Sequence, residues 1–302
     1  IRDRLQIELA DLLYKWSQRL RGYTVLVLYN DETIDSEDAD RIYEALSGIR
    51  QSQRKDVLLV LVSRGGLVVP AYQISKLCRE WSKDKFVVGV PRHAKSAATM
   101  ICLGADAVHM GPLGHLGPID PQFTDSEGYP VSGLALQSSL RMITKWVSEY
   151  PGSHEMWAEI LMKDKYFDFY DVGALERHVE TSVQYGERLL IAGKSNPERA
   201  IAIARKLVYE YQDHGFAIDR DETREIFGED SVVENSNELA FSEEVYRMIS
   251  QVDKGLRGVE FDGGNVVHGG VAVVGALHDS VTVLPRLVRR RSTSQAPEEN
   301  DA

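Results

Sequence analysis

Two short segments carry residue types that could perform acyl-transfer chemistry, and each follows an apolar run. Residues 63–67 read Ser-Arg-Gly-Gly-Leu after the apolar run 57–62, and residues 93–99 read His-Ala-Lys-Ser-Ala-Ala-Thr after the apolar run 86–90. Adjacent glycines have no Cβ, so backbone N–H groups can approach an anion there. A serine at a helix entrance lies where unpaired N–H groups and the helix dipole favour developing negative charge. Together the segments offer a nucleophilic hydroxyl, that of Ser96, and a backbone cradle for an oxyanion.

Each segment alone also has an architectural explanation. Serine is a preferred N-cap residue, and glycine pairs are common in turns between strands and helices. The order of the two segments favours the chemical interpretation, because successive strand-turn-helix units place both turns at the same carboxyl edge of a parallel sheet. Ligands bind at that edge. The sequence therefore predicts an α/β fold with its functional site there.

A longer set of motifs in the same region is specific in combination. It consists of Leu-Val-Ser-Arg-Gly-Gly-Leu-Val at residues 61–68, Ala-Lys-Ser-Ala-Ala-Thr at 94–99, Gly-Ala-Asp at 104–106 and Leu-Gly-Pro-Ile-Asp-Pro-Gln at 116–122. These motifs resemble the serine dehydrogenase proteinase family of the ClpP/crotonase superfamily, which also contains the Clp proteolytic subunit and signal peptide peptidase A. The resemblance is concentrated in residues 23–125, and a further short segment, 213–218, also resembles the family. It implies a serine peptidase that hydrolyses peptide bonds through an acyl-enzyme.

The resemblance also assigns residues by position. Ser96 falls where the peptidases of the superfamily keep their nucleophile, and Gly66 and Ala97 fall where two backbone N–H groups form the oxyanion hole. The Clp subunit has its catalytic histidine after a proline-containing turn, but the matching residues 117–121 here read Gly-Pro-Ile-Asp-Pro. The base is therefore left open between two candidates.

The first candidate base is His214, which falls where the Clp pattern has an aspartate. The two roles would then be exchanged, with His214 as base and Asp120 as the carboxylate that orients it. A histidine before Gly-Phe could equally serve only to hydrogen-bond a loop. The second candidate is Lys145, in the segment 134–147, acting as in the Ser–Lys dyad of signal peptide peptidase A. Such a base needs burial to depress its pKa, whereas lysines are seldom buried.

Two other functions stay open at this point. A crotonase-type enzyme acting on an acyl thioester uses the same oxyanion hole without a nucleophilic serine, and a catalytically silent oligomeric scaffold needs no base at all. The sequence offers no Gly-x-Gly-x-x-Gly after a strand, no evident Schiff-base lysine and no metal-ligand spacing, so we expect no cofactor and no metal. Serine dehydrogenase activity, which the family name mentions, is not expected.

The composition of the chain argues against one class of partner and indicates a cellular compartment. The net charge of -11 over 302 residues argues against nucleic acid, because phosphate binding needs a basic surface. Two cysteines, at positions 78 and 102, suit a reducing compartment, and we expect a cytoplasmic protein. There is no apolar run of about 18 residues, so membrane association is expected only through a segment absent from this chain, which begins at Ile1. The expected partners are a peptide or protein substrate and further copies in a homo-oligomer.

The expected architecture is α/β, a ClpP/crotonase-like core of repeated β-β-α spiral units followed by a largely helical C-terminal part. Four units are expected: an N-terminal helix at 1–20, a ClpP/crotonase-like domain at 21–255, a β-hairpin or arm at 256–288 and a polar tail without order at 289–302. Strands are predicted at 23–29, 57–62, 86–90 and 107–110, with helices at 35–49, 68–81 and 97–104 between or after them. Later helices are predicted at 134–149, 154–162, 171–192, 197–211, 221–227 and 242–250.

Overall fold

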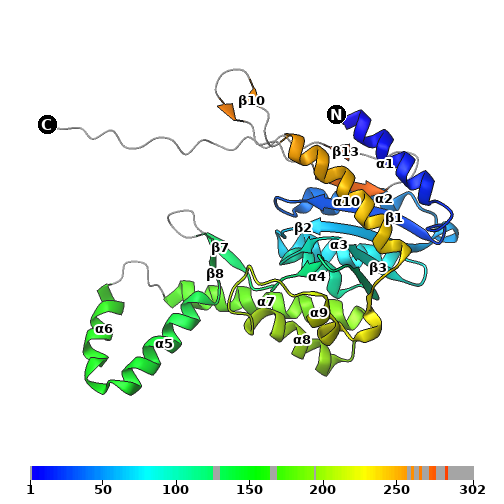
Figure 1. Cartoon of the computed structure of the whole chain (residues 1–302). Coiled ribbons are helices and arrows are strands. Elements are labelled where there is room, and N and C mark those ends of the chain that lie inside the picture. The colour runs from blue at the N-terminus through cyan, green and yellow to red at the C-terminus, as the bar shows by residue number, and fades with distance from the viewer. Residues whose placement is uncertain are drawn as a thin grey trace.

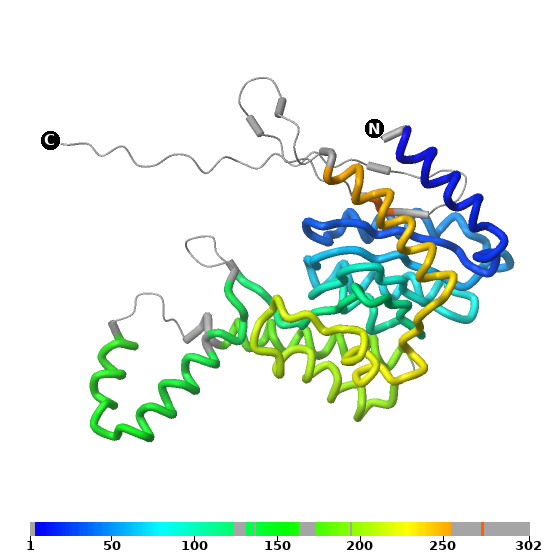
Figure 2. The backbone as a smooth tube through the Cα atoms, in the orientation of Figure 1, coloured from blue at the N-terminus to red at the C-terminus, as the bar shows by residue number. Residues whose placement is uncertain are grey.

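The computed structural model describes residues 2–124, 130–163, 169–193, 195–256 and four short C-terminal pieces, 260–261, 265–266, 272–276 and 283–284 (Figure 2). Its centre is a sheet with the strand order β13-β12-β1-β2-β3-β5-β9, in which the outer strands are β13 (Val283–Leu284), β12 (Ala272–Ala276) and β9 (Val232–Val233). Four apolar runs form the parallel middle of this sheet, as the sequence predicts: β1 (Tyr23–Asn30), β2 (Asp56–Ser63), β3 (Phe86–Val90) and β5 (Ala107–Met110). The residues of these strands are buried almost throughout, because helices cover both faces of the sheet.

Alternate residues of each strand face two separate hydrophobic layers. On one face α1 (Arg2–Trp16) and α10 (Asn237–Leu256) pack over Val27 and Val60. Leu5, Leu9, Leu12 and Trp16 recur at helical spacing and are buried there, so the N-terminal helix docks on its own domain.

The opposite face of the sheet carries the helices that follow β1, β2 and β3. These are α2 (Ser36–Ser47), α3 (Val68–Trp81) and α4 (Ala97–Leu103), and they enclose the inward side chains of Leu26, Leu59 and Val88. Behind them α7 (Phe169–Ala192) and α8 (Pro197–Tyr209) complete the layer (Figure 1). The predicted α/β class, with strand-helix alternation first and helices later, is confirmed.

Two short strands leave the main layer just beyond the carboxyl ends of β2 and β3. β4 (His93–Ala94) pairs with the end of β2, and β6 (His115–Leu116) pairs with β4, both in parallel. Next along the chain, β7 (Gln122–Thr124) and β8 (Pro130–Ser132) form an antiparallel pair. Sequence periodicity misses strands of two or three residues, because they contain too few positions to show alternation.

After β8 a pair of helices leaves the body of the protein. Figure 1 shows α5 (Ala135–Glu149) and α6 (His154–Lys163) as a V that projects away from the sheet, joined through Tyr150 and the 3₁₀ turn η2 (Pro151–Ser153). The remaining elements are the 3₁₀ turns η1 (Gln51–Gln53) and η3 (Glu229–Ser231), the helix α9 (Arg220–Phe227) and the strand β9 (Val232–Val233).

Two stretches differ from the sequence prediction. The helix predicted at 242–250 is longer and begins at Asn237, because the Ser236 hydroxyl accepts the Leu239 N–H and so caps its first turn. The segment predicted as an arm contributes β12 (Ala272–Ala276), which joins the main sheet antiparallel to β1.

The other pieces of the C-terminal segment are short strands. β10 (Glu260–Phe261) and β11 (Asn265–Val266) form an antiparallel pair, and β13 (Val283–Leu284) pairs with β12. The predicted tail at 289–302 lies outside the described residues. None of the helices in the described part of the chain combines the length and the apolarity that crossing a bilayer demands.

Candidate functional site

Ser96 occupies the N-cap position of α4 without behaving as a capping serine. An ordinary N-cap residue has extended backbone and a side chain that accepts a helix N–H. Ser96 instead has φ 52° and ψ −119°, and its hydroxyl makes no capping hydrogen bond. A non-glycine residue in this region costs about 1–3 kcal/mol, and such strain gathers at functional sites. The architectural explanation of Ser96 as a plain helix cap is therefore not supported.

The twin-glycine turn after β2 lies directly against Ser96. A Cβ added to Gly65 would fall 2.7 Å from the Ser96 Cβ and 2.8 Å from the Lys95 carbonyl oxygen. A Cβ on Gly66 would fall 2.2 Å from the backbone nitrogen of Ile34, in the loop after β1. Both glycines also have positive φ, 114° and 153°. No other residue type fits this turn, because the backbone on either side leaves no room for a side chain.

The backbone N–H groups around Ser96 differ in whether another described residue accepts them. The N–H groups of Gly65, Leu67 and Ala98 are occupied by the Ser63 hydroxyl and by backbone carbonyls. In the described part of the chain, the N–H groups of Gly66 and Ala97 take part in no such hydrogen bond. Free N–H groups on both sides of a serine can stabilise negative charge on a carbonyl oxygen that the serine attacks.

Asp120 and His214 form a hydrogen-bonded pair although 94 positions separate them. The His214 Nδ1 lies 2.7 Å from the Asp120 Oδ1; the carboxylate side chain is only 6% exposed, and the imidazole 26%. The other carboxylate oxygen, Oδ2, accepts from the Ser132 hydroxyl at 2.7 Å and from the Gln122 amide at 2.9 Å. The carboxylate is thereby held in one orientation, and the imidazole with it.

Three contacts tie this pair to the Ser96 turn. The Lys95 Nζ donates to the Gly215 carbonyl at 2.7 Å, so the residue before Ser96 holds the residue after His214. The Thr99 hydroxyl accepts the Gly117 N–H at 3.0 Å and so fixes the segment that leads to Asp120. Leu116 and Ile218 exchange backbone hydrogen bonds of 2.8 and 3.1 Å. Segments that are distant in the sequence thus converge around one serine.

A second histidine-carboxylate pair lies at the same sheet edge. The His93 Nε2 is 2.8 Å from the Asp31 Oδ1, and Arg64 donates to the same carboxylate oxygen at 3.1 Å. His115 stands opposite His93 in the β4–β6 pair. Burial lowers the pKa of His115, and the nearby Lys95 and His93 add to that effect. This edge therefore offers a second imidazole that an experiment must separate from His214.

Lys145, the second candidate base, does not lie in the cluster around Ser96. It is on the projecting helix α5, its side chain is 73% exposed, and its Nζ is 3.8 Å from the Glu149 carboxylate in the next turn. A lysine acts as a base at neutral pH when burial disfavours its charged form. That condition is absent at Lys145 in this structure.

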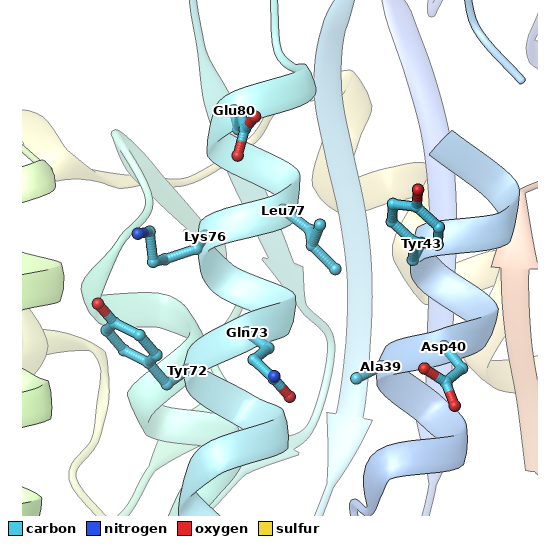
Figure 3. A pocket seen from close by; sticks show the side chains of 8 residues that line it. All are labelled: Ala39, Asp40, Tyr43, Tyr72, Gln73, Lys76, Leu77 and Glu80. Atoms are coloured by element: carbon cyan, nitrogen blue, oxygen red, sulfur yellow. The ribbon is translucent and has the colours of Figure 1, made fainter. Parts of the chain in front are cut away.

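The pocket in Figure 3 is separate from these residues. It is a hollow of about 400 Å³ between α2 and α3, lined by Ala39, Asp40, Tyr43, Tyr72, Gln73, Lys76, Leu77 and Glu80. No residue of the Ser96 cluster lines it. Among the described residues, no group of three or more histidine, cysteine, aspartate or glutamate side chains is placed to hold a metal ion.

Comparison with known proteins identifies the region that carries these residues. Residues 18–138 match a family described as ClpP-like SDH-type serine proteinases. The match covers less than half of the chain, and within it the chain is similar to that family. The matched region contains the twin-glycine turn, Ser96 and Asp120, whereas His214 lies beyond it.

Two curated relatives are themselves uncharacterized. The proteins MJ0137 and MJ1495 of Methanocaldococcus jannaschii are 29% and 28% identical over 129 and 141 residues, which is 39% and 45% of this chain. The matches span 44% and 47% of the relatives' own lengths, so the chain covers less than half of each.

Two solved structures of the 1510-N membrane-bound stomatin-specific protease are also similar to this chain. A serine-to-alanine mutant covers 79% of this chain and 86% of its own, with 14% identity and a TM-score of 0.45. A lysine-to-alanine mutant in complex with a substrate peptide covers 85% and 89%, again with 14% identity and a TM-score of 0.45.

Sequence reasoning missed the groups that support the site. Ser132 and Gln122 hold the Asp120 carboxylate, and Lys95 holds the Gly215 carbonyl. No motif marks Ser132, because the β7–β8 fold-back that brings it to Asp120 is too short to show a period.

Proposed function

We propose that this chain is a serine peptidase that hydrolyses peptide bonds through an acyl-enzyme at Ser96. The observation that carries the proposal is the backbone of Ser96, strained at φ 52° and without a capping bond, against a glycine turn that no side chain could enter. A helix cap needs neither feature. A nucleophile whose oxygen must point at a carbonyl does need a fixed, unusual turn.

In the proposed mechanism His214 is the base and Asp120 its orienting carboxylate. With Asp120 on Nδ1, the neutral imidazole carries its proton there and keeps a lone pair on Nε2. The lone pair takes the proton of the Ser96 hydroxyl as the oxygen bonds to the scissile carbonyl carbon. The carbonyl oxygen becomes an oxyanion that the N–H groups of Gly66 and Ala97 stabilise.

The tetrahedral intermediate then breaks its C–N bond. The imidazolium gives its proton to the leaving amine, and an ester to Ser96 remains. A water molecule, activated by the same imidazole, attacks the ester carbonyl, and the serine oxygen leaves with the proton that His214 returns. Each proton that leaves the serine or the water thus passes through one histidine, so no second base is needed.

A serine-reactive fluorophosphonate tests the nucleophile. We expect labelling of the parent chain and loss of both labelling and peptide hydrolysis on Ser96→Ala, since a methyl group cannot attack. Labelling that persists in Ser96→Ala would show the assignment to be wrong. Inertness of the parent together with thermal stabilisation by coenzyme A would favour an acyl-thioester enzyme, and inertness to both would favour a scaffold.

The base is tested by three matched variants, His214→Ala, His93→Ala and Lys145→Ala. Loss of general base catalysis costs about 10²–10⁴-fold in rate. We expect a loss of that size in His214→Ala alone. A comparable loss in His93→Ala, with His214→Ala unaffected, would move the base to the second histidine pair. A loss in Lys145→Ala would restore the dyad hypothesis.

A further inference from the structure

Asp31 contacts the two segments that lie on either side of the candidate oxyanion hole. It directly follows β1, and its Oδ1 atom lies 2.8 Å from the His93 Nε2 and accepts from the Arg64 Nε at 3.1 Å. Arg64 directly precedes Gly65 of the twin-glycine turn, and His93 opens the strand β4 that leads to Ser96. One carboxylate oxygen, on a side chain that is 14% exposed, therefore joins both segments.

The register of the strands explains why these side chains meet. At the edge of the sheet, Asn30 of β1 pairs with Ser63 of β2, and Ser63 pairs with Ala94 of β4. Successive side chains of a strand point to opposite faces, so the residues next to these three share the other face. Those neighbours are the three residues that form the contact.

The loop that carries Asp31 is itself fixed by a buried asparagine. Asn30 is 2% exposed, and its side-chain amide donates to the Asp38 Oδ2 at 2.9 Å and to the Thr33 carbonyl at 3.1 Å. Its side-chain oxygen accepts the Glu32 N–H at 3.0 Å. The backbone on both sides of Asp31 is thus held, and its carboxylate has a fixed place from which to hold other groups.

The backbone of the same loop also holds the glycine turn. The Ile34 N–H donates to the Gly65 carbonyl at 2.9 Å, and the Ile34 carbonyl accepts the Leu67 N–H at 2.8 Å. These bonds hold the turn from one side. Because Asp31 also contacts His93, the same loop supports the segment that leads to the serine.

We propose that Asp31 is a positioning residue that sets the separation of the two backbone N–H groups of the oxyanion hole. This role rests on the proposed function, since it matters only if the serine is acylated. Arg64 lies two residues before Gly66, and His93 lies four residues before Ala97. Two donors stabilise an oxyanion best when both are aimed in advance at the same oxygen atom. Asp31 acts on them through Arg64 and His93 and takes no proton in the reaction.

Loss of the Asp31 carboxylate should slow the reaction rather than weaken binding. The oxyanion forms only as the serine attacks, so the hydrogen bonds to it change the rate and not the affinity for the unreacted reagent. A misplacement of about 1 Å can cost about 10²-fold in rate. We expect Asp31→Ala to lower the maximal rate of labelling by about 10–100-fold and to leave the half-saturating reagent concentration within about twofold.

The experiment follows labelling by the serine-reactive fluorophosphonate over a range of reagent concentrations, which gives both quantities. Asp31→Asn keeps an oxygen that can accept from both donors, so we expect it to recover most of the rate. The matched control is Glu32→Gln, which neutralises the next carboxylate of the same loop, an exposed one, and should label like the parent. Melting temperatures establish that each variant is folded.

Double variants test whether Asp31 acts through its two contacts. His93→Ala removes one of them and should cost about tenfold, less than the loss of a general base. Asp31→Ala/His93→Ala should label no more slowly than Asp31→Ala alone, whereas losses that multiply would show independent effects and overturn the proposal. If Asp31→Ala does not fold, Arg64→Met/His93→Ala removes both donors instead and should show the same loss; the parental rate in that variant would overturn the proposal.

A failure of this role for Asp31 and a failure of the proposed function give different results. If the parent is labelled at Ser96 and the folded Asp31→Ala variant labels at the parental rate, Asp31 has no positioning role and the peptidase proposal stands. A loss confined to the half-saturating concentration would also overturn the role, because Asp31 would then contribute to binding. A parent that is not labelled would refute both.

Discussion

Lys95 is expected to act as a positioning residue for the base, and Lys95→Met tests this. Its ammonium group donates to the Gly215 carbonyl at 2.7 Å and so fixes the loop that carries His214 against the Ser96 turn. A Cβ on Gly117 would lie 3.2 Å from the Lys95 Cγ, so the stem of the lysine is also held. Methionine keeps the length of the stem and removes the donor.

The size of the effect follows from the type of bond. A hydrogen bond from a charged donor contributes about 1.5–3 kcal/mol. The contact is open to solvent, so we take a value just below this range, about 1.4 kcal/mol. That free energy corresponds to about a tenfold change in rate. We expect Lys95→Met to lower the second-order rate of fluorophosphonate labelling about tenfold.

Two variants make the result specific. Lys95→Arg retains a charged donor and should recover most of the rate, and Lys85→Met removes an exposed lysine outside the site and should have no effect. Melting temperatures establish that all three variants are folded. A labelling rate for Lys95→Met equal to that of the parent, or an equal loss in the arginine variant, would refute the role of the Lys95–Gly215 contact.

Three further outcomes are expected. Gly66→Ala should destabilise the fold by about 1–3 kcal/mol in urea titrations and abolish labelling, because its Cβ would lie 2.2 Å from the Ile34 nitrogen; unchanged labelling would contradict this. Burial raises the pKa of the Cys78 and Cys102 thiols, so Ellman's reagent should find no thiol in the folded chain and two after unfolding. Burial lowers the pKa of His109, so the unfolded chain binds more protons below about pH 6.5 and stability should fall as the pH drops there. The variant His109→Gln should melt with a weaker pH dependence, and an unchanged dependence would show that His109 is not the group responsible.

The sequence predicts most of the sheet, because its four parallel strands are continuous apolar runs that helices cover on both faces. It also predicts the approach of the twin glycines to Ser96, since parallel strands bring their turns to one edge. The backbone strain at Ser96 and the support of Asp120 by Ser132 could not be predicted. Both arise from tertiary contacts between segments whose own patterns are weak.

The candidate base His214 shows the same limit of prediction from the sequence. His214 and Asp120 are far apart in the chain, and only the fold brings the imidazole nitrogen to 2.7 Å from the carboxylate. Lys145, the other candidate base, lies instead on an exposed arm. The position of a residue in the sequence does not reveal how deeply its side chain is buried, and burial decides whether a lysine can act as a base.

Ser132 connects the projecting helix pair to the Asp120–His214 pair. Its hydroxyl donates to the Asp120 carboxylate and accepts the N–H of Leu134, the N-cap residue of α5. A movement of the helix pair α5–α6 would therefore act, through Ser132, on the Asp120 carboxylate that holds the His214 imidazole. We expect a compound that binds beside Ser132 and displaces its hydroxyl from Asp120 to lower any activity that depends on the Asp120–His214 pair, without occupying the Ser96 turn.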